Sequence, residues 1–411
     1  MSDQRLGIWL VGACGGVATA ATTGLLALQK NLTRGTGLVS ELPLFAHLDL
    51  PSWDQFVVGG HEIRDVSLTD EADRLHRESR VLDAKLLDAC REDLKAIKQR
   101  IRPGTLRNVG ETICQLAAET PYQDPIAASD ASGQQAVDRL KSDLQEFRQQ
   151  HRLADVVVVN VASTEASNTA ESSTGSSTMG PATWPATWRE TQALMDCLPA
   201  SSLYAIVAFE LGMPYINFTP SLGAEPQGLD DLARIQNVCH AGRDGKTGET
   251  LLKSVLAPMF TARHLEVLSW VGHNIFGNLD GKVLDNPVNK AAKLQSKDQL
   301  LGKIFGYSPE TLVSIEHIAS LGDWKTAWDH IHFKGFLDTP MTLQLTWHGC
   351  DSLLAAPLVL DLVRFTLAAK SRGETGSLTF LSSFFKSPQG IDEHAFAEQY
   401  GWLLEWAQQS P

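Results

Sequence analysis

The feature that most constrains the fold is a glycine turn near the start of the chain. Residues 6–11 form a short apolar run that ends at Gly12, and glycines at positions 15 and 16 lead into residues 17–28, which are rich in Ala, Thr and Leu. This order predicts a strand, a glycine turn and a helix. Backbone N–H groups in such a turn can approach a pyrophosphate closely, and the helix N-terminus favours negative charge. The turn reads G-x-x-G-G rather than G-x-G-x-x-G, so a tight turn without a ligand stays an alternative.

Apolar runs at intervals along the chain predict a parallel sheet. Four consecutive valines, residues 156–159, indicate a strand that is buried on both faces. Further strands are expected at residues 56–58, 214–218 and 238–241, and helices at about 69–99, 133–151, 202–211 and 250–261. Strands that alternate with helices predict a doubly wound α/β fold.

The pattern changes after about residue 264. Strands are expected at residues 266–271, 314–317, 327–333 and 341–347, with alternating polar and apolar positions in places, and a helix returns at 353–370. We therefore expect residues 264–350 to form an inserted α+β domain, and residues 1–263 and 351–411 to form the α/β domain. Asp351 or Ser352 is well placed to cap the last long helix.

Charge and cysteine content narrow the possible partners. The 411 residues carry a net charge of −13, which disfavours binding to nucleic acid or to an anionic membrane. Six scattered cysteines without a C-x-x-C pair suit a reducing compartment. We read no signal peptide and no apolar run long enough to span a membrane, so the cytoplasm is the expected location. A phosphate substrate would need positive charge concentrated locally.

The stretch from Gly242 to Lys253 supplies such a concentration. Its Gly-Lys-Thr, residues 245–247, looks like the end of a P-loop, but a P-loop requires a glycine where His240 stands. A strand-to-helix loop that carries Lys246, with Lys253 two turns later, could still bind phosphate. A solvated loop at the start of a helix is the alternative.

Three further loops carry polar or charged side chains. They are Asn274–Gly281, which contains Asp280; Ser296–Lys297; and Gly322–Lys325, which contains Asp323. Taken singly, each is also typical of a plain surface turn. The histidines show no diagnostic ligand spacing, so no metal site is expected.

Taken together and in order, these segments resemble the inositol-1-phosphate (3-phosphate) synthase family. The most specific matches are GRDGKTGETLLKSVL at residues 242–256 and DSLLAAPL at 351–358. The segments LVGACGG, ASTE, SLYA, YIN, GNLDG and GDWK support them in the same order. The resemblance implies a Rossmann-like domain that binds NAD, an inserted catalytic and tetramerisation domain, and hence a homotetramer.

The resemblance also implies a reaction. C5 of D-glucose 6-phosphate is oxidised with NAD as hydride acceptor, loss of a C6 proton gives an enolate that attacks the C1 aldehyde, and the cyclic ketone is reduced to 1D-myo-inositol 3-phosphate. Fixed cations would stabilise the anionic enolate and phosphate, and a buried lysine can shuttle protons. The product would enter inositol biosynthesis.

The resemblance assigns roles to individual residues of this chain. The expected catalytic set is Lys246, Lys253, Lys297, Lys325, Asp280 and Asp323. Within it Lys325 is the expected proton shuttle at the oxidised carbon. The expected NAD-binding set is Gly12, Ala13, Cys14, Gly15, Gly16, Ala162, Ser163, Thr164, Asp244 and Asp351.

The chain departs from the family pattern in several places. FTPSLG, residues 218–223, stands where many relatives carry Gly-Ser-Pro-Gln-Asn-Thr, and His61-Glu62 replaces a Trp-Asp pair. Glu62 is therefore a candidate for the ribose contact. Leu301 stands where a second lysine is common, with Lys303 nearby. These departures are typical of a divergent bacterial-type branch.

Two other functions stay open from the sequence. One is an NAD-dependent enzyme that acts on another phosphosugar, which product analysis would separate from the synthase. The other is a non-catalytic NAD-binding regulator, which would bind the cofactor without turnover. Lysines retained in separate loops disfavour the regulator.

Overall fold

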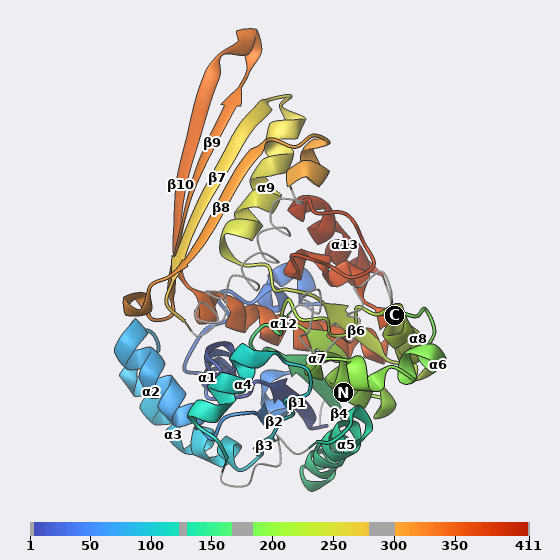
Figure 1. Ribbon diagram of the computed structural model, residues 1–411. Coiled ribbons are helices and arrows are strands. Elements are labelled where there is room, and N and C mark those ends of the chain that lie inside the picture. Colours follow the sequence, from blue (N-terminus) through green and yellow to red (C-terminus); the bar gives the residue numbers. More distant parts are fainter. Residues whose placement is uncertain (1–3, 123–129, 167–183, 279–300, 410–411) are drawn as a thin grey trace.

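The computed structural model describes residues 4–122, 130–166, 184–278 and 301–409. Its central element is a parallel seven-stranded sheet in the order β11-β6-β5-β4-β1-β2-β3 (Figure 1). The strands are β1 (Leu6–Val11), β2 (Phe56–Glu62), β3 (Ile101–Pro103), β4 (Asp155–Asn160), β5 (Tyr215–Asn217), β6 (Cys239–Gly242) and β11 (Gly376–Ser377). The run 3-2-1-4-5-6 is the strand order of a Rossmann fold, so the expected doubly wound sheet is confirmed.

The valines of β4 show why this sheet forms where it does. All four are fully buried. Val157 and Val159 belong to the hydrophobic core on one face of the sheet, and Val156 and Val158 belong to the core on the other face. A strand packed on both faces must be apolar at every position, and this is the pattern that predicted it.

Helices cover both faces of the sheet. One face packs against α1 (Gly16–Gln29), α3 (Ala84–Lys98) and α12 (Asp351–Ser371). The other packs against α5 (Gly133–Gln150), α7 (Ala200–Glu210) and α8 (Gln227–Ile235). The helical region expected at 69–99 is two helices, because α2 (Leu68–Ser79) ends at Arg80 in a left-handed conformation before α3 begins. Smaller helices are α4 (Glu111–Glu119) and α6 (Trp188–Gln192).

The longest core helix, α12, corrects one expectation. The most apolar 18-residue stretch of this 21-residue helix has a mean hydropathy of 1.7, so by length and composition the helix could cross a membrane. Of its most apolar stretch, 78% is buried inside the protein. Burial between the sheet and α1 accounts for this apolar character without a membrane.

A second sheet, of four strands in the order β10-β9-β7-β8, projects from the first (Figure 1). Its strands are β7 (Glu266–Phe276), β8 (Glu310–His317), β9 (Trp324–Lys334) and β10 (Pro340–Cys350). They all fall inside the expected insertion. Helix α9 (Gly248–Ala262), which we had grouped with the first domain, packs Ala257 and Phe260 against this second sheet. The last helix, α13 (Phe396–Gln408), lies beside α9 and the η9 turn at Thr379–Phe384.

Candidate functional site

A cavity opens at the carboxyl ends of β1, β2 and β4. It encloses about 1230 Å³, its open mouth included. Its walls come from the glycine turn, from the ends of β2 and β4, and from the start of β9 and α12. In doubly wound sheets this edge, where the strand order reverses between β1 and β4, is where dinucleotides bind.

The glycine turn is shaped by contacts that only glycine allows. Gly12 has φ +82°, and a Cβ there would lie 2.7 Å from the Cα of Ala162. The N–H groups of Gly12 and Ala13 donate to the carbonyl of His61 at 2.9 and 3.0 Å. The first-turn N–H groups of α1 lack intrahelical partners, as at any helix start, and sit at the cavity edge where Gly15, Gly16 and Val17 line it. This turn fits a pyrophosphate group.

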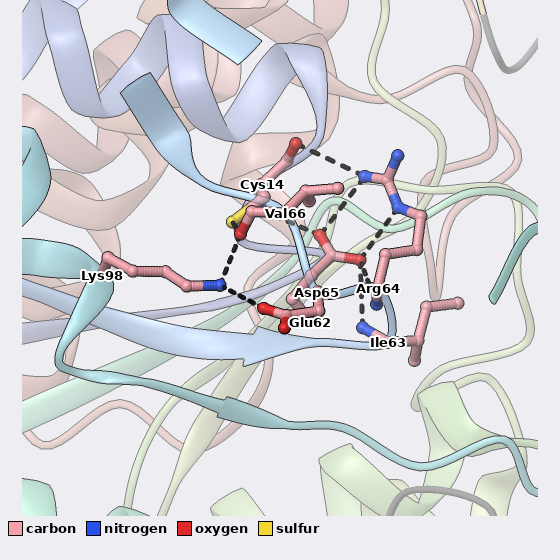
Figure 2. A network of polar contacts seen from close by, with 7 residues as sticks. All are labelled: Cys14, Glu62, Ile63, Arg64, Asp65, Val66 and Lys98. Atoms are coloured by element: carbon pink, nitrogen blue, oxygen red, sulfur yellow. Dashed lines mark hydrogen bonds and ion pairs between the residues drawn. The ribbon is translucent and has the colours of Figure 1, made fainter. Parts of the chain in front are cut away.

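Glu62 ends β2 at the other side of the turn (Figure 2). Its carboxylate accepts hydrogen bonds from the backbone N–H of Cys14 at 2.9 Å and from that of Ile63 at 3.0 Å. The Arg64 guanidinium pairs with both oxygens, at 3.2 and 3.4 Å. An acidic side chain at the end of β2 is where Rossmann proteins bind the adenosine ribose, so the position of Glu62 fits the contact suggested for it.

Cys14 faces away from the cavity. Its side chain is fully buried, and its thiol lies 3.6 Å from the carbonyl of Val66. Burial, together with the nearby Glu62 carboxylate, raises the pKa of Cys14 to about 12. The contribution of Cys14 to the turn is therefore its backbone, which holds Glu62 in place. Lys98 fixes the next segment through Asp65 and Val66 (Figure 2).

The predicted NAD-binding residues divide into two groups. Those that line the cavity are Gly12, Gly15, Gly16, Ala162, Ser163 and Asp351. Those that do not line it are Ala13, Cys14, Thr164 and Asp244. The first group surrounds the pyrophosphate position and the start of α12, whereas Asp244 lies in the loop after β6.

Asp323 is the predicted catalytic residue that reaches this cavity. Its side chain is buried, and its carboxylate accepts hydrogen bonds from the Cys350 thiol and from the Ser352 N–H and hydroxyl, at 2.9, 2.8 and 2.9 Å. Burial raises the pKa of Asp323 despite these hydrogen bonds. The expected cap of α12 by Asp351 or Ser352 is thus wrong, because Cys350 occupies the N-cap position and Asp323 supplies the acceptor.

Glu165 is a cavity residue that the sequence did not single out individually. Its carboxylate accepts the backbone N–H of Ser201 at 2.7 Å and the Ser201 hydroxyl at 2.5 Å, at the first turn of α7. Burial raises the pKa of Glu165 to about 7. The acidic residue of the ASTE segment therefore ties the cavity wall to α7.

The lysines of the 242–256 segment, Lys246 and Lys253, do not line the cavity. Lys246 is buried, and its ammonium donates to the side-chain oxygen of Gln399 on α13. Burial lowers the pKa of Lys246 to about 7. Lys253 is also buried and pairs with Glu249 at 2.7 Å, while Asn274 donates to the same carboxylate at 2.7 Å.

Lys325 lies where the second sheet meets the cavity. It is two residues beyond Asp323 at the start of β9, opposite Phe276 in the ladder, and its ammonium lies 5.3 Å from the centre of the Phe276 ring. Two residues after the end of β7 stands Asn278, which lines the cavity. Asp280 and Lys297 lie outside the described residues.

Lys386 is a candidate that sequence reasoning missed. Its ammonium pairs with Asp244 at 2.9 Å, and its backbone N–H donates to the Asp244 carbonyl at 2.6 Å. A bridge between Gly245 and Phe385 holds the two segments together. Lys386 therefore adds a cation to the loop after β6. Within the ranges that the structure describes, no group of three or more His, Cys, Asp or Glu side chains could hold a metal ion.

Comparison with known proteins agrees with this geometry. A family model described as "Myo-inositol-1-phosphate synthase", and named for NAD binding, matches residues 6–408. The chain is 30% identical over 414 residues to inositol-3-phosphate synthase 1 of Bacteroides thetaiotaomicron, which covers 95% of this chain and 91% of that relative. It is 27% identical over 409 residues to inositol-3-phosphate synthase isozyme 1 of Arabidopsis thaliana, and the match covers 90% of this chain and 76% of that relative.

Solved structures show the same fold. Inositol-3-phosphate synthase from Caenorhabditis elegans superposes with a TM-score of 0.81 at 22% identity, covering 98% of this chain and 85% of that one. A myo-inositol-1-phosphate synthase-related protein from Thermotoga maritima superposes with a TM-score of 0.76 at 20% identity, covering 99% of both chains. By the extent of these matches, the chain belongs to the myo-inositol-1-phosphate synthase family.

Proposed function

We propose that this protein is an inositol-3-phosphate synthase, which converts D-glucose 6-phosphate to 1D-myo-inositol 3-phosphate. Bound NAD would accept a hydride from C5 and return it after ring closure, so that no cofactor is consumed. The observation that carries the proposal is the cavity itself. Its glycine turn and Glu62 fit a dinucleotide, and Asp323, at the start of β9 in the second sheet, lines the cavity beside Gly16.

The chain's own residues are assigned by their positions. Gly16 and its neighbours on α1 hold the pyrophosphate, and Glu62 accepts a ribose hydroxyl. Lys325 takes and returns the proton at the oxidised carbon, because it is the cation that lies beside Asp323 at the junction of the sheets. Lys297 and Asp280, which lie outside the described residues, are proposed to take part in the reaction on the family resemblance alone.

The buried lysines of α9 and its loop have supporting roles in this proposal. Lys246 and Lys253 are occupied by Gln399 and Glu249. We assign them to holding the loop after β6, which carries Asp244. The segment that carries Lys386 is bridged to this loop. Lys386 then supplies positive charge for the substrate phosphate or the enolate, both of which are stabilised by fixed cations in a dry site.

One experiment tests the reaction. Purified protein is incubated with D-glucose 6-phosphate and catalytic NAD, and phosphorus NMR follows the products. The expected result is inositol phosphate without net NADH. Accumulated NADH would instead indicate a simple dehydrogenase, and turnover of a different phosphosugar would indicate a related enzyme. NAD binding without turnover of any substrate in a panel would indicate a regulator.

A variant pair tests the proton shuttle. Lys325→Ala should lower turnover by at least 100-fold, in the range typical of a lost general acid–base group. Lys334→Ala is the matched control, because Lys334 lies on the same strand but pairs with Glu266 and Asp338 at the far end. Unchanged turnover in Lys325→Ala would contradict the assignment of Lys325 as the proton shuttle.

We also propose that the protein is a homotetramer located in the cytoplasm. Light scattering of the purified protein would test the oligomeric state, and cell fractionation would test the location.

A further inference from the structure

Phe276 and Lys325 face each other at the end of the second sheet that meets the cavity. They are partners in the β7–β9 ladder, in which Phe276 is the last residue of β7 and Lys325 is the second residue of β9. Asn278, two residues after Phe276, and Asp323, two residues before Lys325, both line the cavity. On each strand the pair is therefore two residues from the part of the cavity wall that the second sheet supplies.

The backbone at this end of the sheet leaves the pair little freedom. A Cβ on Gly277 would lie 2.5 Å from the carbonyl oxygen of Ile318 and 2.8 Å from the nitrogen of Gly322, so the chain after β7 packs directly on the turn before β9. The N–H of Ile318 donates to the carbonyl of Phe276 at 2.9 Å. Close backbone contacts therefore set the position of the Phe276 ring relative to the stem of Lys325.

The ring of Phe276 is the group that contacts the Lys325 ammonium. Phe276 is 4% exposed and packs with Ile315 and Val313 of β8. The Nζ of Lys325 lies 5.3 Å from the centre of the ring, within the distance of about 6 Å at which a cation is attracted to a ring face. Across the residues that the structure describes, this ammonium has no hydrogen bond and no ion pair. The ring face is therefore the contact that orients it.

An aromatic ring holds a lysine differently from a carboxylate. The negative face of the ring attracts the cation through the ring quadrupole, and the attraction is stronger where water is excluded. A carboxylate would also attract the cation, but it would take up the N–H donors in short hydrogen bonds. A phenyl ring leaves these donors and the proton available, as a group that exchanges a proton with a substrate requires.

We propose that Phe276 is a positioning residue for the reaction. Its ring keeps the head group of Lys325 at the cavity and stabilises the ammonium form, which is present whenever Lys325 holds the proton taken from the substrate. In the oxidation step the O–H bond at C5 breaks and its proton bonds to Nζ, while C5 gives a hydride to NAD; in the final reduction the proton and the hydride return. The inference rests on the proposed function, because it assigns Phe276 to the proton transfer by Lys325.

Graded fluorination of the ring tests this role in turnover. Phe276 is replaced by mono-, di- and trifluorinated phenylalanine, which keep the shape of the ring but withdraw charge from its face in steps. The kcat for inositol phosphate formation should fall at each step and be lower by at least about threefold in the trifluorinated variant, with little change in KM. In the Lys325→Ala background the trifluorinated ring should cause no further loss, because the contact is already absent.

NMR measures the contact independently of activity. Lysines are labelled by reductive ¹³C-methylation, which keeps their positive charge, and the Lys325 signal is the one that is missing from Lys325→Ala. The ring current of Phe276 should shift this signal upfield. Phe276→Leu should return it to the position of an exposed lysine such as Lys95.

Phe365 provides the matched control for fluorination. It is also buried, its ring contacts those of Phe45 and Trp406 at 5.2 and 6.1 Å, and within the described ranges no lysine or arginine lies over it. Trifluorination of Phe365 should leave kcat unchanged. Thermal melts of each variant report whether the fold persists, and a loss of kcat that Phe365 shares would be a general effect of fluorine on the core.

The possible outcomes separate the inference from the proposed function. If inositol phosphate forms and kcat is the same for every ring, Phe276 only packs, so the inference is wrong and the proposed function stands. If the Lys325 signal shows no ring-current shift, the contact is absent and the inference is wrong whatever the turnover. If the wild type shows the shift but forms no inositol phosphate, the proposed function fails and the positioning role fails with it.

Discussion

Asp323 and Ser352 are joined by two hydrogen bonds that connect the start of β9 to the first turn of α12. One carboxylate oxygen accepts the Ser352 N–H at 2.8 Å and the other accepts its hydroxyl at 2.9 Å. A Cβ on Gly16 would lie 2.5 Å from the Ser352 hydroxyl. One pair of residues therefore brings together the second sheet, the longest core helix and the glycine turn.

Replacing Asp323 should weaken both the fold and the cofactor site. Asp323→Ala removes the side-chain acceptor of the Ser352 N–H at the α12 N-terminus, and lost caps cost about 1–2 kcal/mol of the free energy of unfolding. NAD affinity should fall as well, because the cavity wall at Gly16 loosens. Urea unfolding and calorimetry measure the two effects. Asp338→Ala, at an exposed hairpin position, is the control, and equal behaviour of the two variants would contradict the prediction.

Gly12→Ala should abolish dinucleotide binding while Gly24→Ala should not. At Gly12 the new Cβ would meet the Ala162 backbone at 2.7 Å with φ at +82°, so the turn must distort. At Gly24, in α1, nothing lies within 4 Å of a new Cβ. Gly24→Ala should therefore raise the free energy of unfolding by up to about 1 kcal/mol. Binding titrations with NAD measure the affinity of both variants, and urea melts measure their free energies of unfolding. Tight NAD binding by Gly12→Ala would show that the turn is not the pyrophosphate site.

The sequence predicted the sheets well because their strands carry strong local signals. The four valines of β4 are apolar at every position, as burial on both faces requires. Alternation likewise marked the second sheet. The packing partner of helix α9 could not be predicted, because its apolar residues show that it packs but not against which sheet. That choice depends on Phe260 meeting Trp270, a contact between elements.

The candidate site was harder to predict because it depends on contacts that are distant in the chain. The generic spacing places an acidic ribose-binding residue about 20 residues after the glycine turn. Here residues 30–55 separate α1 from β2, so Glu62 comes much later in the chain than that spacing predicts. Lys386 carries no local motif and reaches Asp244 only through the bridge beside it. Asp323 caps α12, although the β9–β10 hairpin separates the two in the chain. Sequence patterns describe faces of elements, whereas these residues act between elements.

Lys386→Ala should lower turnover by about two orders of magnitude, the range seen when a fixed group that stabilises developing charge is removed. The structural reason is that Lys386 brings a cation to Asp244 in the loop after β6. Steady-state kinetics with D-glucose 6-phosphate would measure the loss. Lys95→Ala is the control, because Lys95 is an exposed lysine on α3 that pairs with the exposed Glu92 at 2.7 Å. Turnover that is equal in the two variants would remove Lys386 from the site.

Lys246→Met should change how stability depends on pH. Burial lowers the pKa of Lys246 from 10.5 to about 7, so between these values the unfolded chain holds a proton that the folded chain has released. Stability from this group therefore rises as pH rises from about 7 toward 10.5, and the destabilising effect is full below pH 7. Methionine keeps most of the bulk and removes the charge. The variant should gain stability relative to wild type at pH 6.5, and the gain should shrink toward pH 10.

Urea unfolding of both proteins at pH 6.5, 8 and 9.5 measures this difference. Each unit of pKa shift corresponds to about 1.4 kcal/mol, and the loss of the Gln399 contact offsets part of the gain at every pH by a constant amount. The slope with pH, rather than the sign at one pH, is therefore the quantity to compare. Lys334→Met, at a more exposed position, should differ from wild type without this slope between pH 7 and 10. A Lys246→Met difference that is independent of pH would mean that the buried ammonium keeps its proton through neutrality, and Lys246 would then be a charged anchor of α13.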